Sequence, residues 1–225
     1  MKKVFLIAAL TFISAATFAQ FSFGVQAIGN LSDATVKNPV DFDFTRTMKL
    51  APGGGIVAQY DISPNIIIRS GVNYIQHAVD LKADLSDDNG DLTVKAENRL
   101  HYVQIPLTAM YGFPVGQSRI YAGAGGYFNY GFSGKSKGTV TYFDDDGNEI
   151  SFTEDMDAFK KEDEDGANLK RAEFGVTAIA GIELKNGLFV NAGYQLGLTN
   201  SDRTDGAKYK NRGLQLTVGY LFRLR

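Results

Sequence analysis

The 225-residue sequence contains no cysteine, no tryptophan, only two histidines and only five prolines. Without cysteine, the chain forms neither a disulfide framework nor a metal site built on thiolates. Beyond the first nineteen residues, no apolar run approaches the roughly 18 residues that a transmembrane helix needs. The two histidines, His77 and His101, show no arrangement typical of nucleophilic catalysis. We therefore expect no enzymatic activity, no catalytic residue and no cofactor.

The first nineteen residues have the pattern of a secretory signal peptide. Lys2 and Lys3 form a short basic region, an apolar run follows, and Thr17-Phe18-Ala19 provides a small-x-small cleavage site. We expect residues 1–19 to be removed and residues 20–225 to form a single domain without a lipid anchor. Losing both lysines makes the formal net charge of −2 more negative, and such a chain has no nucleic-acid footprint.

Glycine and aromatic residues are abundant, with 25 Gly, 16 Phe and 11 Tyr, and the remaining chain alternates between apolar and polar residues. This alternation is typical of β-strands, and each run has the ~9–11 residues that a tilted strand needs to cross a bilayer. The eight runs are Phe21–Leu31, Met48–Ile62, Ile66–Leu85, Asn98–Phe113, Arg119–Tyr142, Lys170–Leu184, Leu188–Thr199 and Asn211–Phe222.

The connections between these runs alternate between short and long. Tight turns are expected at residues 61–65, 113–118 and 185–187, where Asn186-Gly187 is a pair that accepts positive φ at both positions. Long polar loops are expected at residues 32–47, 86–97, 143–169 and 200–210. This alternation is the pattern of an eight-stranded antiparallel up-and-down transmembrane β-barrel. The termini and short turns would then lie on the periplasmic side, and the long loops outside the cell.

The two faces of the predicted strands differ in composition. On the seventh run, one face carries Phe174, Val176 and Ile182, whereas the other carries Glu173, Gly175 and Glu183. A soluble barrel would place the aliphatic face inside and expose a glycine-rich face, although a water-facing sheet normally carries Lys, Glu and Thr. A membrane barrel places the aliphatic face in lipid and uses glycine to make room for large side chains in a narrow lumen. We favour the membrane barrel.

The segment Tyr102-Val103-Gln104-Ile105-Pro106-Leu107, with Tyr111, carries a family resemblance. It resembles the Y-x-x-I/L-P-L-x-x-x-Y strand of Bacteroidota outer-membrane β-barrel proteins, the porin-like or PorT-like family. The turn Ser63-Pro64-Asn65 and the ending Gly219-Tyr220-Leu221-Phe222 are similar as well. The resemblance covers essentially the whole mature chain and implies an outer-membrane barrel; PorT-like members are linked to a secretion machinery.

Proline removes a hydrogen-bond donor from a β-ladder. We therefore expect a bulge or a local break in pairing near Pro106, with its ring pointing into the barrel.

Two groups of residues are candidate sites. Arg69, Glu173 and Glu183 are expected to face the lumen, with His77 and Asp61 possible neighbours; an ion-pair network is favoured over acid–base catalysis. In the third long loop, Asp144, Asp146, Asn148 and Glu149 form a weak calcium candidate, because oxygen ligands surround a glycine turn without the full twelve-residue loop.

Three function classes are consistent with this sequence. The first is a structural or surface-interaction barrel that contacts outer-membrane lipid and binds surface proteins or ligands through its acidic loops. The second is a small-solute transport barrel, a pore or a secretion-system component. The third is a membrane-embedded lipid-modifying enzyme. Because eight strands leave room only for side chains, whereas open porins need ~16–18, we favour the first.

Overall fold

The computed structural model describes residues 20–37, 45–87, 90–143, 148–160, 166–204 and 206–223. The predicted signal peptide lies outside these residues and stays a prediction. The described residues form nine strands: β1 (Phe21–Lys37), β2 (Thr45–Asp61), β3 (Ile66–Asp87), β4 (Gly90–Val115), β5 (Ser118–Phe143), β6 (Glu149–Asp157), β7 (Ala172–Glu183), β8 (Leu188–Gly197) and β9 (Lys208–Arg223). Within the described ranges, no helix is long and apolar enough to cross a membrane.

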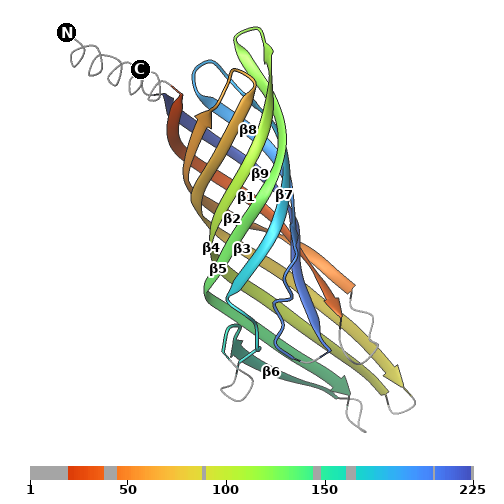
Figure 1. The fold of residues 1–225 in the computed structure, drawn as a ribbon. Helices are drawn as coiled ribbons and strands as arrows, with labels where there is room; N and C mark the ends of the chain where they lie inside the picture. Colours follow the sequence, from red (N-terminus) through yellow and green to blue (C-terminus); the bar gives the residue numbers. More distant parts are fainter. Residues whose placement is uncertain are drawn as a thin grey trace, which may run out of the picture.

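Eight of the nine strands close into an antiparallel barrel (Figure 1). The chain ends meet where β1 pairs with β9, and the ring closes because β4 pairs with β5 and β5 with β7. The predicted eight-stranded up-and-down barrel is therefore confirmed. The ninth strand, β6, lies inside the predicted loop 143–169 and pairs with β5 beyond the ring. Treating that segment as a loop was wrong.

The long connections are shorter than predicted because the strands continue past the barrel. Strands β1 and β2 extend into the predicted loop 32–47, and β9 begins at Lys208, inside the predicted loop 200–210. The predicted loop 86–97 is mostly strand, since β3 runs to Asp87 and β4 starts at Gly90. These extensions, with β6, project away from the end where β1 and β9 begin and finish (Figure 1).

The predicted division into two faces is confirmed. Residues of the inward phase are buried, among them Arg69, Glu173 and Glu183. Large apolar side chains of the opposite phase are exposed, including Phe174, Val176, Ile182, Tyr194, Leu196, Leu198, Leu214, Leu216, Val218, Tyr220 and Phe222. This inside-out arrangement is what a lipid environment requires, because a closed barrel satisfies its backbone internally and offers apolar side chains outward.

The outward apolar band ends part-way along β3. Its outward positions are mostly apolar up to Tyr74 and mostly polar beyond it, with Ser70 and Ala78 as the exceptions. The apolar residues are Ile66, Ile68, Val72 and Tyr74, and the polar ones are Gln76, Asp80 and Lys82. The Tyr74 hydroxyl also forms a hydrogen bond with His101 Nδ1, with 2.7 Å between the two atoms. Aromatic side chains favour the border between hydrocarbon and headgroups. The outer part of β3, from Gln76 onward, therefore lies beyond the apolar band.

Two local predictions are tested by the strand ladders. Pro106 pairs in register with Tyr127 on β5, but the β3–β4 ladder passes from Ser70–Leu107 to Asn73–Gln104 and leaves Pro106 unpaired on that side. The predicted local break in pairing at Pro106 is therefore confirmed, whereas the register shift between β4 and β5 lies at His101/Tyr102. The proline ring faces the lumen as predicted, and Ser70 Oγ donates to the Pro106 carbonyl at 2.7 Å. In the turn between β7 and β8, only Gly187 has positive φ, at 94°, whereas Asn186 uses its side-chain oxygen to accept from Leu188 N.

Candidate functional site

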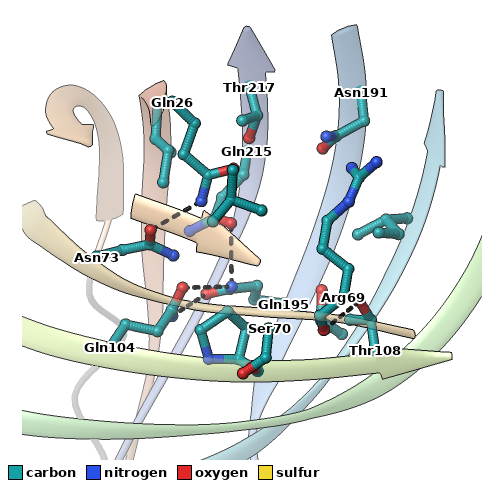
Figure 2. Close-up of a pocket in the computed structure, with 15 residues that line it drawn as sticks. Gln26, Arg69, Ser70, Asn73, Gln104, Thr108, Asn191, Gln195, Gln215 and Thr217 are labelled. Atoms are coloured by element: carbon teal, nitrogen blue, oxygen red, sulfur yellow. Dashed lines mark hydrogen bonds between the residues drawn. The ribbon is translucent and has the colours of Figure 1, made fainter. Parts of the chain in front are cut away.

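The middle of the lumen is a polar chamber. Amide side chains cross it in hydrogen-bonded pairs: Gln26 donates to Asn73 at 2.7 Å, and Gln195 donates to Gln215 at 3.0 Å and exchanges bonds with Gln104 (Figure 2). A cavity of about 60 Å³ remains between them. That volume holds a few water molecules. The chamber is therefore largely filled by side chains.

The end of the lumen beside the short turns is closed by ion pairs, a group we call the ionic floor. The carboxylate of Glu183, on β7, is 1% exposed and contacts three arginines. The distances are 2.6 Å from Arg223, 2.9 Å from Arg119 and 3.7 Å from Arg69. Asp61 completes the group through Arg119, at 3.2 Å.

Arg69 is held in place from several sides. Its guanidinium donates to Gln59 and to the Tyr121 hydroxyl, and it lies 4.8 Å and 4.5 Å from the ring centroids of Tyr121 and Phe189. A buried charge persists when it is paired and hydrogen-bonded in this way. The expected pairing of Arg69 with Glu183 is thus present in the structure. The sequence interpretation missed Arg119 and Arg223, because only closure of the ring brings β5 and β9 to β7.

Glu173 does not belong to the ionic floor. It lies near the other end of β7 and accepts hydrogen bonds from Asn211 at 2.5 Å and from the Tyr127 hydroxyl at 3.1 Å. Among the described residues, no basic side chain forms an ion pair with it, so an ion-pair network joining Glu173 to Arg69 and Glu183 is not what the structure shows. His77 is buried further out, edge-on to the Tyr102 ring at 5.3 Å.

The end of the lumen opposite the short turns is closed by an apolar cluster, which we call the plug. Ala158 and Phe159 follow β6 and fold back into the barrel mouth, where they join Leu169 and the strand residues Ala34, Val79, Leu81, Leu100, Tyr102 and Tyr209. The Phe159 ring fits because β5 carries a glycine at position 131, where a Cβ would lie 2.2 Å from the ring. The guanidinium of Arg171 lies 5.1 Å from the same ring centroid.

Beyond the barrel, the outer parts of β3, β4 and β5 continue with β6 as a sheet, which we call the protruding sheet. Directly opposite residues on neighbouring strands share a face. One face is apolar, with the rows Val94, Val140, Phe152 and Leu92, Tyr142, Ile150. The other face is polar, with the rows Lys95, Thr139, Thr153 and Glu97, Lys137, Asp155. Both faces are exposed, and the apolar one needs explanation, since Phe152 is 62% exposed.

Two candidates remain, the predicted calcium loop and a serine motif on β5. Asp144 and Asp146 lie outside the described residues, so the calcium prediction is untested, and the described residues contain no group of three acidic or histidine side chains placed for a metal. The segment Gly134–Gly138 matches a Gly-x-Ser-x-Gly motif that the sequence interpretation overlooked. It runs straight through β5, whereas the nucleophile elbow formed by this motif is a sharp turn between a strand and a helix.

Comparison with known proteins agrees with this architecture. The family model for the outer membrane protein beta-barrel domain matches residues 18–203. No curated protein matches the chain.

Three solved structures are similar to this chain. Neisserial surface protein A is 14% identical, with 90% of this chain and 97% of that chain covered and a TM-score of 0.37. Ail of Yersinia pestis, solved with the heparin analogue sucrose octasulfate, is 13% identical, with 90% and 99% covered and a TM-score of 0.34. The N-terminal β-barrel domain of Pseudomonas aeruginosa OprF is 14% identical, with 89% and 97% covered and a TM-score of 0.33.

Proposed function

Because the chain belongs to the outer membrane protein beta-barrel domain family, which places it in the bacterial outer membrane, we propose that it is a non-conducting barrel that holds an interaction surface outside the cell. The observation that supports this proposal is the contrast between a lumen filled by side chains and a protruding sheet with an exposed apolar face. Isolated exposed apolar residues are ordinary, but a contiguous apolar face outside the lipid band marks a contact surface. The partner class is a surface protein or ligand.

The same proposal gives the barrel an orientation. The protruding sheet would face the exterior, and the ends of β1 and β9, with the short turns, would face the periplasm. Since the sequence has no cysteine, a single introduced cysteine is the only thiol in the protein. We expect a membrane-impermeant maleimide to label Phe152→Cys in intact cells and Lys185→Cys, in the short turn, only after permeabilisation. The reverse pattern would contradict the orientation.

The partner is tested by photo-crosslinking in intact cells. A photoreactive residue at position 152 would lie on the apolar face, and one at position 153 would lie on the polar face of the same strand. We expect adducts from position 152 and far fewer from position 153. Equal yields, or none from either position, would remove the support for the apolar face.

The transport alternative is tested in planar bilayers. The ionic floor, the chamber and the plug each obstruct the lumen, so we expect no stable channels from the purified barrel. Reproducible channels of nanosiemens conductance would overturn the non-conducting assignment.

Membership of the narrower Bacteroidota PorT-like group stays our hypothesis. It rests on the motif from Tyr102 to Tyr111, and a secretion-system role would require co-isolation with such a machinery.

A further inference from the structure

Strand β6 is the last strand of the sheet, and its edge away from β5 is open. Among the described residues, this edge meets only Gly166, through a single bridge at Asp157, the last residue of the strand. Figure 1 shows β6 beside β5 at the border of the protruding sheet. An open edge presents a row of backbone N–H and C=O groups with which another extended segment can pair.

Two backbone hydrogen bonds show which residues of β6 use the open edge. The N–H of Ala158, directly after β6, donates to the Gly134 carbonyl on β5, whereas the carbonyl of Asp157 accepts from Ala167 on the opposite side. Successive residues of a strand turn their backbone groups to opposite sides. Even-numbered residues of β6 therefore bond to β5, and odd-numbered residues present their backbone groups to the open edge. Before Asp157, these exposed odd-numbered residues are Glu149, Ser151, Thr153 and Asp155.

The side chains of β6 determine the charge of a matching segment. The strand carries the acidic residues Glu149, Glu154, Asp155 and Asp157 and no basic residue. Charged residues on an edge strand usually prevent unwanted pairing. Because all charges here have one sign, they oppose pairing with a second copy of β6 and favour a basic segment.

The alternation of β6 determines the pattern of that segment. Opposite Ile150, Phe152 and Met156 the segment needs apolar residues, because directly opposite residues share a face. Opposite Glu149 and Asp155 it needs basic residues. On the apolar face, a hollow of about 520 Å³ lies beside Phe152 and Met156. The hollow gives the apolar side chains of a partner a place to pack.

We propose that β6 accepts an extended segment of a surface protein as an additional strand. The segment alternates between basic and apolar residues, and the rest of that protein packs on the apolar face of the protruding sheet. In such an addition, backbone hydrogen bonds supply the affinity and alternate side chains supply the specificity. This inference rests on the proposed function and names the partner of the same surface.

The probe is a synthetic alternating Lys–Val peptide long enough to span β6. It is added to the refolded barrel in nanodiscs of phosphatidylcholine, which has no net charge to attract it, and amide exchange is followed by NMR. We expect the peptide to slow exchange at Ser151, Thr153 and Asp155. The amides of Phe152 and Glu154 bond to β5 and should be protected with or without it. A peptide with the same residues in two blocks should not bind.

The matched variants differ only at position 153. Thr153→Pro removes an N–H from the open edge while leaving the ladder with β5, so the alternating peptide should bind at least about tenfold more weakly. Thr153→Ala removes the same side chain but keeps the N–H, and it should bind like the unmodified protein. Equal binding of the two peptides, or no slowing of exchange at the three open-edge amides, would overturn the added strand whether or not Thr153→Pro folds.

Failure of this inference can be told apart from failure of the proposed function by crosslinking in cells. If adducts from position 152 persist in Thr153→Pro, the partner docks on the apolar face without adding a strand, and only this inference is overturned. If position 152 gives no adducts in the unmodified background, the contact surface itself is contradicted.

Discussion

The two ends of the lumen are closed by opposite chemistry. The ionic floor is built from strand residues, with one carboxylate shared by arginines from β3, β5 and β9. The plug is built largely from apolar side chains, and its central residue, Phe159, comes from a connection rather than from the ring. The floor therefore forms with the barrel, whereas the plug forms only when the connection after β6 docks. This difference predicts that the barrel needs the floor for its folding stability, whereas the plug can be lost while the barrel stays folded.

The largest effect is expected from removing the shared carboxylate of the floor. Glu183→Gln leaves three arginines without their common partner, and breaking such a buried group costs about 3–5 kcal/mol. We expect a lower urea midpoint of unfolding in vesicles. Asp61→Asn, which touches only Arg119 and is partly exposed, should cost clearly less. Equal losses in the two variants would show that the floor is not organised around Glu183.

Acid should lower the folding stability of the barrel by protonating His77. Burial lowers the pKa of His77 from 6.5 to about 4, so the folded state binds its proton less readily than the unfolded state. The folded state therefore loses stability as the pH falls from 6.5 towards 4, by about 3 kcal/mol in total, and gains it again as the pH rises.

The measurement is unfolding in urea at several pH values within this window. His77→Phe keeps an aromatic ring against Tyr102 and should flatten the pH dependence. His101→Phe, at the outward contact with Tyr74, should keep the dependence of the unmodified protein. An unchanged slope in His77→Phe would exclude His77 as the cause.

A smaller effect is expected from emptying the plug. Phe159→Ala should cost about 2 kcal/mol, below the ~3–5 kcal/mol usual for a buried phenylalanine, because the connection can collapse into the space. Limited proteolysis should cut the connection after β6 faster while the ring stays protected. Gly131→Val, which denies the ring its space, should give the same cleavage pattern. Protection unchanged in both variants would mean that Phe159 does not hold the plug.

The smallest effect is the coupling between the two ends. Phe159 and Glu183 lie at opposite ends of the lumen. The loss of unfolding free energy in the double variant should therefore equal the sum of the losses in the two single variants to within ~0.5 kcal/mol. We also expect no channels in planar bilayers from either single variant, because the other closure and the amide chamber remain. A large coupling energy would show that floor and plug respond to each other through the lumen.

The strands and their faces could be predicted because alternation is a local property. Phe174 and Glu173 are neighbours in the chain, and strand geometry alone sends them to opposite sides of the sheet. The inward glycines followed from the same alternation together with the width of an eight-stranded barrel.

Contacts across the lumen could not be predicted, because they depend on the register of every strand around the ring. Arg223 reaches Glu183 across β8, and no local pattern indicates this. Phe159 was missed because it lies in a charged segment whose docking depends on a glycine on β5. The break in pairing at Pro106 was predictable because proline has no N–H to give to β3, whereas the register shift on β5 opposite His101 and Tyr102 has no such local signal.

Strand β6 is joined to the rest of the sheet along β5 alone, while the ring closes without it through β4, β5 and β7. Substitutions, insertions or replacement of residues 149–157 would therefore leave the membrane-spanning ring intact. In evolutionary terms, this hairpin is free to diversify at little cost to folding. In engineering terms, it is the position at which a foreign peptide could be inserted without disturbing the ring.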